Sequence, residues 1–396
     1  MEHGTPAGLL RSRDDGAARV TFFELFFDLV FVFAVTQLSH RLLKDLTVSG
    51  AGETLVLLLA VWWAWMYTCW TTNWLNPDHP AVRMTLTGTM LAGLLMAAAI
   101  PKAFEGRALW FAVAYVACQA GRTAFVAFMT RRDELSANFV RILAWKLTTA
   151  VLWIGGAFAD HPARIVAWVG ALTLEYAAPW HGYTFPGLGR SRTSDWTIDG
   201  GHMAERCQLF VIIALGESLL VTGATFSDLS GVGTAAGAAF AVAFLGSVAM
   251  WWIYFDRSAE AAAERIAASA DPGRLGRSAY TFIHLPMVAG IIVSAVADEL
   301  VVAHPHGHVT GGTAAVVLGG PALFVAGHAL FKRAVWGHFT TARLLALAAL
   351  AALAPVSKLV DPLTLSFLAL LVMAALAGWD VRSRRSSIVV VPEQAA

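Results

Sequence analysis

The stretch FFELFFDLVFVFAVTQLS, residues 22–39, decides the fold class of this chain. Its only charged side chains are Glu24 and Asp28. A helix needs about twenty apolar residues to cross a bilayer, and only a helix or a closed barrel satisfies its backbone hydrogen bonds in lipid. No small-residue cleavage site follows the stretch, so we expect a retained first transmembrane helix and no removable signal peptide.

The composition of the whole chain agrees with this interpretation. Of its 396 residues, 57% are hydrophobic and 14% are charged, against about 45–50% and about 25% in soluble domains. The surplus of apolar side chains is expected to face lipid, so the bilayer is the predicted partner. A net charge of +1 gives no strong positive field, and no nucleic-acid partner is predicted.

The run-length rule predicts an all-α polytopic membrane protein of about 12 transmembrane helices. The expected spans are residues 22–40, 53–74, 84–101, 108–129, 139–158, 163–179, 203–226, 234–255, 279–300, 312–331, 338–355 and 363–379. Lys and Arg are about three times as frequent in the loops on the N-terminal side of this topology as in the others. This bias predicts that both termini are cytoplasmic.

A linker rich in Gly, Ser, Thr and Arg, residues 183–201, separates two predicted six-helix halves, 20–182 and 202–380, and short cytoplasmic tails are expected at 1–19 and 381–396. Sliding the sequence by 180 residues pairs Asp28 with Gln208 and Gln37 with Glu217. Two six-helix halves with an even number of spans would be parallel repeats, related by an axis along the membrane normal.

Ionisable side chains inside the first span are candidates for function, because each costs about 2.5–3.5 kcal/mol to insert. Glu24 and Asp28 share one helix face by their i, i+4 spacing. Two such carboxylates repel each other unless one is protonated or a cation lies nearby. Proton relay and cation coordination both fit. The alternative is an interfacial Glu24 with only Asp28 buried, hydrogen-bonded to a neighbouring span.

The seventh span carries a second polar group. His202 and Glu205 could shuttle a proton or hold a metal, but two ligands are too few and no metal site is predicted. The alternative is that Glu205 and Arg206 pair at the helix start. Glu217 is the only charge in residues 209–221, so we expect it to face a polar cavity or the bundle interior, with a role in transport or catalysis. The alternative is a structural hydrogen bond.

Other motifs narrow the possibilities. The three cysteines form no CxxC pair, and the sequence has no phosphate-binding glycine loop, nucleophile elbow or zinc-protease pattern, so no cofactor is predicted. Aromatic residues at 62–67 and 251–254 fit interfacial belts, or else the lining of a cavity for a cation or a polyene.

The segment FELFFDLVFVFAVTQLSHRL, residues 23–42, resembles the signature of the bacterial low-temperature-requirement A family, and HMAERCQLFVIIALGESLL, residues 202–220, resembles its second motif. The resemblance covers about residues 18–380 and implies a multi-pass protein of the bacterial inner (plasma) membrane. The family name records a cold-growth phenotype and brings no catalytic role. The family's prominent polar residues fall on Glu24, Asp28, Gln37, His202, Glu205, Arg206, Glu217 and Ser218.

The first motif is also loosely similar to the pore-lining helix of a potassium channel family with two six-span repeats and an FSD sequence. This chain reads FFD and lacks that serine, so channel function is an analogy. Our main hypothesis is a transporter or channel for a small solute or ion. The path is expected along Glu24, Asp28, Gln37, His202, Glu205, Arg206, Gln208 and Glu217. The alternatives are an intramembrane enzyme acting on a lipid or isoprenoid and a membrane scaffold or sensor in cold adaptation. The sequence leaves the ligand and the oligomeric state open.

Overall fold

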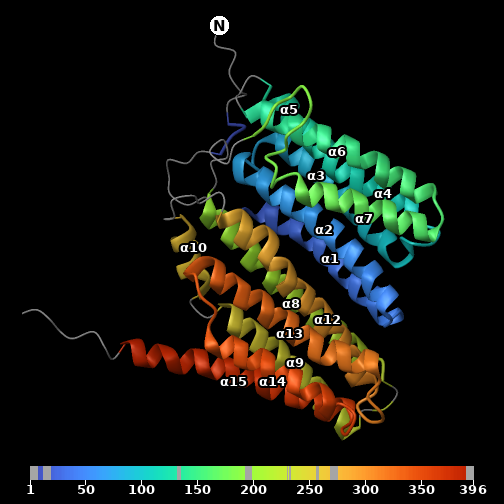
Figure 1. Cartoon of the computed structure of the whole chain (residues 1–396), viewed down its shortest axis with the longest axis vertical. Coiled ribbons are helices and arrows are strands. Elements are labelled where there is room, and N and C mark those ends of the chain that lie inside the picture. Colours follow the sequence, from blue (N-terminus) through green and yellow to red (C-terminus); the bar gives the residue numbers. More distant parts are fainter. Residues whose placement is uncertain are drawn as a thin grey trace, which may run out of the picture. The chain divides into compact units, whose positions relative to one another are not determined.

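The computed structural model describes residues 8–11, 19–131, 135–191, 199–229, 231, 233–255, 258–267 and 275–388. Within these ranges the chain forms helices and no strand longer than an isolated bridge. The α-helices, labelled in Figure 1, are α1 Phe22–Lys44, α2 Val48–Trp74, α3 Pro80–Ala99, α4 Ala108–Val116, α5 Arg122–Met129, α6 Leu135–Phe158, α7 His161–Ala177, α8 Gly200–Ser227, α9 Thr234–Phe255, α10 Ser258–Ala267, α12 His284–Ala303, α13 Gly311–Trp336, α14 Thr341–Val356 and α15 Pro362–Ile388. Short π-helical turns, Ala117–Gly121 and Arg277–Ile283, lead into α5 and α12.

The predicted all-α membrane architecture is confirmed. Ten helices of the described chain are long and apolar enough to cross a membrane, with α4 and α5 forming one continuous segment. The expected spans at 163–179 and 338–355 correspond to α7 and α14, which have only 17 and 16 residues. At about 1.5 Å per residue, such helices are shorter than a hydrocarbon core of about 30 Å.

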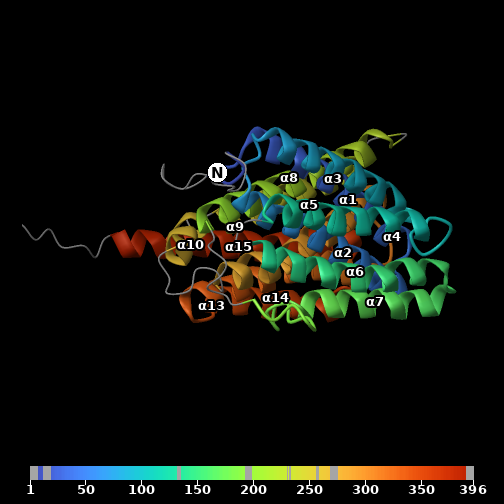
Figure 2. The same cartoon turned by 90° about the horizontal axis from the view of Figure 1, so that it is seen from above.

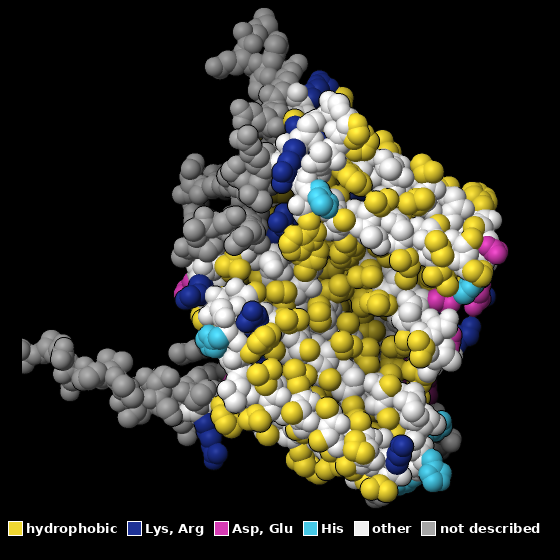
Figure 3. Space-filling model, in the orientation of Figure 1, with side chains coloured by type: hydrophobic (Ala, Val, Ile, Leu, Met, Phe, Trp, Pro, Cys, Tyr) yellow, Lys and Arg dark blue, Asp and Glu magenta, His cyan; other side chains and the backbone are white. Residues whose placement is uncertain are grey.

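The surface is apolar where a soluble protein would be polar. Hydrophobic side chains dominate the face shown in Figure 3, and charged ones are few. Large side chains such as Trp110, Val151 and Leu220 are 65%, 70% and 69% exposed. Large apolar side chains exposed in such number are stable only against lipid or another protein, which agrees with a bilayer environment.

The chain divides into two compact units. Unit 1 comprises residues 1–210 and 267–277, and unit 2 comprises residues 211–266 and 278–396, so the division falls inside α8. In unit 1, α1 packs on α2 and α3, and α6 packs on α4, α5 and α7. In unit 2, α12 packs on α13 and α9, and α15 packs on α9 and α14. The long helices of each unit run side by side (Figure 2).

The predicted halves 20–182 and 202–380, their relation as parallel repeats and the cytoplasmic placement of both termini stay predictions. Most of the tail 1–19, the middle of the linker 183–201 and residues 389–396 of the C-terminal tail lie outside the described residues.

Helices α12 and α13 approach each other closely through glycines. A Cβ atom on Gly290 would lie 2.5 Å from the backbone nitrogen of Phe324, and one on Gly320 would lie 2.7 Å from the backbone nitrogen of Ser294. Such distances leave room for hydrogen atoms only. Small residues therefore set the spacing of these two helices, as is common between membrane helices.

Candidate functional site

Glu24 is the centre of a buried polar cluster in unit 1. Its Oε1 lies 2.8 Å from Nε2 of His202 and 3.1 Å from Nη1 of Arg206, and its Oε2 accepts hydrogen bonds from Arg11 at 2.7 Å and from the backbone N–H of Thr21 at 2.9 Å. The last bond completes a capping box, in which the Thr21 hydroxyl accepts from the Glu24 N–H. Helix capping and ion pairing thus hold one carboxylate in place.

Asp28 lies one turn further along α1 and shares Arg206 with Glu24. Its Oδ1 accepts hydrogen bonds from Nη2 of Arg206 at 2.5 Å and from Nε1 of Trp65 at 2.7 Å. Its Oδ2 is buried and has no hydrogen-bond partner within the described chain. The side chains of Glu24, Asp28, His202 and Arg206, here called the carboxylate–arginine cluster, are completely buried.

The repulsion expected between Glu24 and Asp28 is relieved by a cation that the chain itself supplies. The guanidinium of Arg206 bridges the two carboxylates, and Arg11 pairs with Glu24 from the other side. With His202 neutral, two negative and two positive groups balance. The cluster therefore needs no bound metal ion for neutrality, and no metal-ligating group of three His, Cys, Asp or Glu occurs in the described residues.

Asn73 of α2 fixes the tautomer of His202. The amide oxygen of Asn73 accepts from the backbone N–H of Asp199 at 3.0 Å, and its nitrogen donates to the carbonyl of Asp199 at 2.9 Å. This orientation turns the amide nitrogen toward Nδ1 of His202, at 3.1 Å. Because an amide nitrogen only donates, Nδ1 accepts, and the proton of the neutral ring is on Nε2, facing Glu24.

The other predicted path residues lie outside this cluster. Glu205 is half-buried and accepts a hydrogen bond from the backbone N–H of Val20 at 2.9 Å. The pair of Glu205 with Arg206, which was the alternative interpretation, does not form, because Arg206 binds the carboxylates of α1. Gln37 and Gln208 are half-buried in unit 1. Glu217 is half-buried in unit 2, 11 residues beyond Arg206 on α8, and its role in a path stays a prediction.

The contribution of α2 was not predicted from the sequence. The aromatic residues at 62–67 were expected in an interfacial belt, which is wrong for Trp62, Trp63 and Trp65, because all three are at most 2% exposed. Trp65 instead donates its indole N–H to Asp28. An aromatic run gives no sequence signal that separates a buried hydrogen-bond donor from a belt residue, since both need an apolar ring with a polar edge.

A second buried network lies elsewhere in unit 1, around Glu175 of α7. Its carboxylate accepts hydrogen bonds from Lys146 and Tyr115, both at 2.7 Å, from Thr149 at 2.9 Å and from Trp153 at 3.0 Å. Each oxygen has two donors, so the group is fully satisfied. This network, which was not predicted from the sequence either, has the features of a structural ion pair.

Comparison with known proteins agrees with the motifs. Residues 19–378 match the family model described as bacterial low temperature requirement A protein. A protein of Rhizobium meliloti (strain 1021), which is described as uncharacterized, is 41% identical over 327 residues, covering 82% of this chain and 80% of the relative. No solved structure matches the chain.

Proposed function

Because this chain belongs to the bacterial low-temperature-requirement A family of multi-pass membrane proteins, we propose that it is a proton-coupled transporter of a small ion or solute. In this proposal the carboxylate–arginine cluster is the proton-carrying site. The observation that carries the proposal is the contact of 2.8 Å between Nε2 of His202 and Glu24, inside a fully buried cluster whose second carboxylate has a free oxygen.

The contrast with Glu175 supports a functional role. A buried carboxylate kept for structure gains most when both oxygens are hydrogen-bonded, because an unpaired buried polar atom costs about 1–3 kcal/mol. Glu175 meets this condition fully. Asp28 does not, since Oδ2 accepts no bond in the described chain. A free, buried carboxylate oxygen is a place for a proton.

The geometry supports a relay through His202. The ring passes a proton when Nδ1 takes one up while Nε2 releases its own proton to Oε1 of Glu24. Nδ1 is occupied by the donor nitrogen of Asn73, so Asn73 must first move away. Once Glu24 is neutral it no longer attracts Arg206, and the guanidinium then pairs with Asp28 only. Each proton thus changes the charge balance that ties α8 to α1 in unit 1.

The experiment is flux through the purified protein in liposomes, with an imposed proton gradient and with Na⁺, K⁺ or neutral buffer outside. We expect Glu24→Gln and Asp28→Asn to reduce proton-coupled flux at least about tenfold. Asp380→Asn is the matched control, because Asp380 is also buried and paired with an arginine, Arg343, at 2.5 and 2.8 Å. This variant should keep flux in proportion to its folded fraction.

Two results would contradict the proposal. One is equal flux in wild type and both cluster variants, which would show that the cluster is structural. The other is no flux of protons or cations through folded wild-type protein. That result would favour the lipid-modifying enzyme or the cold-adaptation scaffold.

A further inference from the structure

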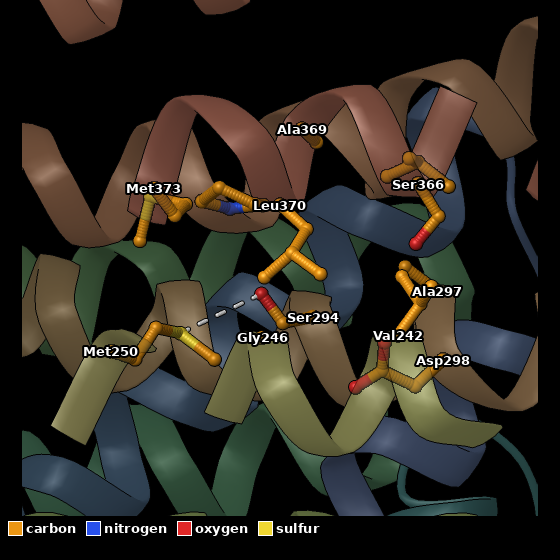
Figure 4. A pocket seen from close by; sticks show the side chains of 12 residues that line it. Val242, Gly246, Met250, Ser294, Ala297, Asp298, Ser366, Ala369, Leu370 and Met373 are labelled. Atoms are coloured by element: carbon orange, nitrogen blue, oxygen red, sulfur yellow. Dashed lines mark hydrogen bonds between the residues drawn. The ribbon is translucent and has the colours of Figure 1, made fainter. Parts of the chain in front are cut away.

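Unit 2 contains a small cavity that is separate from the cluster. It has a volume of about 40 Å³ and is lined by residues of α9, α12, α13 and α15. Ser294 and Asp298 of α12, Ser366 of α15 and Gly246 of α9 border it (Figure 4). A single water molecule needs about 10–15 Å³ of such cavity volume, so the cavity has room for an ion with one or two waters.

Asp298 gives the cavity its charge. It is the only charged side chain among the described residues of the lining, and it is partly buried. Within the part of the chain that the structure describes, Asp298 makes no hydrogen bond and no ion pair. It lies five residues before the end of α12 at Ala303, and Ser366 lies four residues after the start of α15 at Pro362. The cavity is therefore about one to two turns inside these helix ends.

Further oxygen atoms surround the same space. Ser294 of α12 and Ser366 of α15 both carry hydroxyls in the lining of the cavity (Figure 4). The Ser294 hydroxyl donates only a weak bond, to Sδ of Met250 at 4.0 Å, which leaves its oxygen lone pairs available. The wall thus offers a carboxylate and two hydroxyls, all hard oxygen ligands.

A proline inside α13 frees a further oxygen, a backbone carbonyl. Pro321 stands inside α13 and lines the cavity together with Val317. Proline has no N–H, so the carbonyl of the residue four positions earlier, Val317, loses its helical hydrogen bond. Backbone carbonyls freed where a transmembrane helix unwinds coordinate cations in membrane transporters, and Pro321 frees one carbonyl while α13 stays continuous. Helix α13, which forms part of the cavity wall, therefore contains one carbonyl oxygen that has no helical hydrogen-bond donor.

We propose that this cavity binds one monovalent alkali cation, with Asp298 as the charged ligand. The single carboxylate matches a charge of +1, whereas a divalent ion would leave an uncompensated charge in an apolar setting. Oxygen ligands favour hard cations over the softer metals that thiolates and imidazoles select. The claim that this cation is the transported or coupled ion rests on the proposed function. The claim that the cavity binds a cation does not.

The test is thermal unfolding of the purified full chain at one pH and one ionic strength, with NaCl, KCl or LiCl replacing N-methylglucamine chloride. We expect at least one alkali cation to raise the Tm saturably, by about 2–4 °C at concentrations well above its Kd. Asp298→Asn should abolish the shift and, because it removes an unpaired charge, should be at least as stable as wild type without the cation.

Two further variants keep the test decisive. Glu299→Gln is the matched control, because Glu299 is the adjacent carboxylate and is not in the cavity lining, so this variant should keep the cation shift. Gly246→Leu fills the space, since a Cβ atom on Gly246 meets no atom within 4 Å. It should lose the shift with Asp298 intact.

The proposal is overturned if no alkali cation shifts the wild-type Tm, if Asp298→Asn responds as wild type does, or if lowering the pH is the only change that stabilises the protein. The readout is equilibrium binding and not flux. An Asp298-dependent shift in a protein without proton-coupled flux would leave the site standing and remove only the proposed transport function.

Discussion

Nη2 of Arg206 on α8 lies 2.5 Å from Oδ1 of Asp28 on α1, although the two residues are 178 positions apart. Both side chains are completely buried. The pair fastens the first turns of α8 to α1, in agreement with the assignment of α8 up to Phe210 to unit 1.

Breaking this pair from one side should be costly. Asp28→Asn leaves Arg206 with half of its charge compensation, and removal of one partner of a buried pair costs about 3–5 kcal/mol. The measurement is chemical unfolding in detergent, completed as a double-mutant cycle with Arg206→Gln, where we expect clear non-additivity. The control is Asp78→Asn, whose partner Arg83 and own side chain are 52% and 63% exposed. It should cost less than about 1 kcal/mol. Equal costs for the two pairs would contradict this assignment.

The tautomer of His202 should depend on Asn73. In wild type we expect ¹⁵N NMR of the imidazole to show a neutral ring with its proton on Nε2. Asn73→Asp replaces the donor nitrogen with an acceptor, so Nδ1 should become protonated at neutral pH, and the ring should carry a positive charge. The His202 signals are assigned by their loss in His202→Gln. Asn76→Asp, the same change three residues later in an exposed loop contact, should leave the ring unchanged. A protonated Nδ1 in wild type would refute the geometry.

The glycines between α12 and α13 should not be replaceable. Gly290→Ala places a methyl group 2.5 Å from the backbone nitrogen of Phe324, so the helices must separate, at a cost of about 1–3 kcal/mol or more. Gly319 is the matched control, because a Cβ atom there meets no atom within 4 Å. Gly319→Ala should stabilise the helix by about 0.5–1 kcal/mol. The measurement is the Tm of each variant compared with that of wild type. A Gly290→Ala protein as stable as wild type would disprove the close contact.

The Glu175 network should affect stability and not flux. Lys146→Met leaves the Glu175 carboxylate buried without its cation, which should cost about 3–5 kcal/mol. Adding Glu175→Gln removes the stranded charge and should recover part of this loss, as denaturant unfolding would show. Flux per folded molecule should equal that of wild type in the double variant. A loss of proton coupling there would mean that the Glu175 network belongs to the transport path together with the carboxylate–arginine cluster.

Local features of the sequence determined the architecture. Runs of about twenty apolar residues predicted twelve spans, and each of them corresponds to a helix in the structure. This was possible because crossing lipid is a requirement on composition and length alone. The i, i+4 spacing likewise placed Glu24 and Asp28 on one helix face. The lengths of α7 and α14 were less predictable, since the ends of helices depend on their neighbours and caps.

Tertiary structure decided what neutralises and orients these groups. The expected cation near Glu24 and Asp28 is Arg206. Asn73 orients the ring of His202, and Trp65 is a buried hydrogen-bond donor. No spacing along the chain specifies these contacts. The cavity at Asp298 needs residues from α9, α12, α13 and α15. The sequence alone determines whether a helix can lie in lipid, because this property depends only on the side chains of that helix. The tertiary structure decides which side chains meet, because helix packing brings distant segments of the chain into contact.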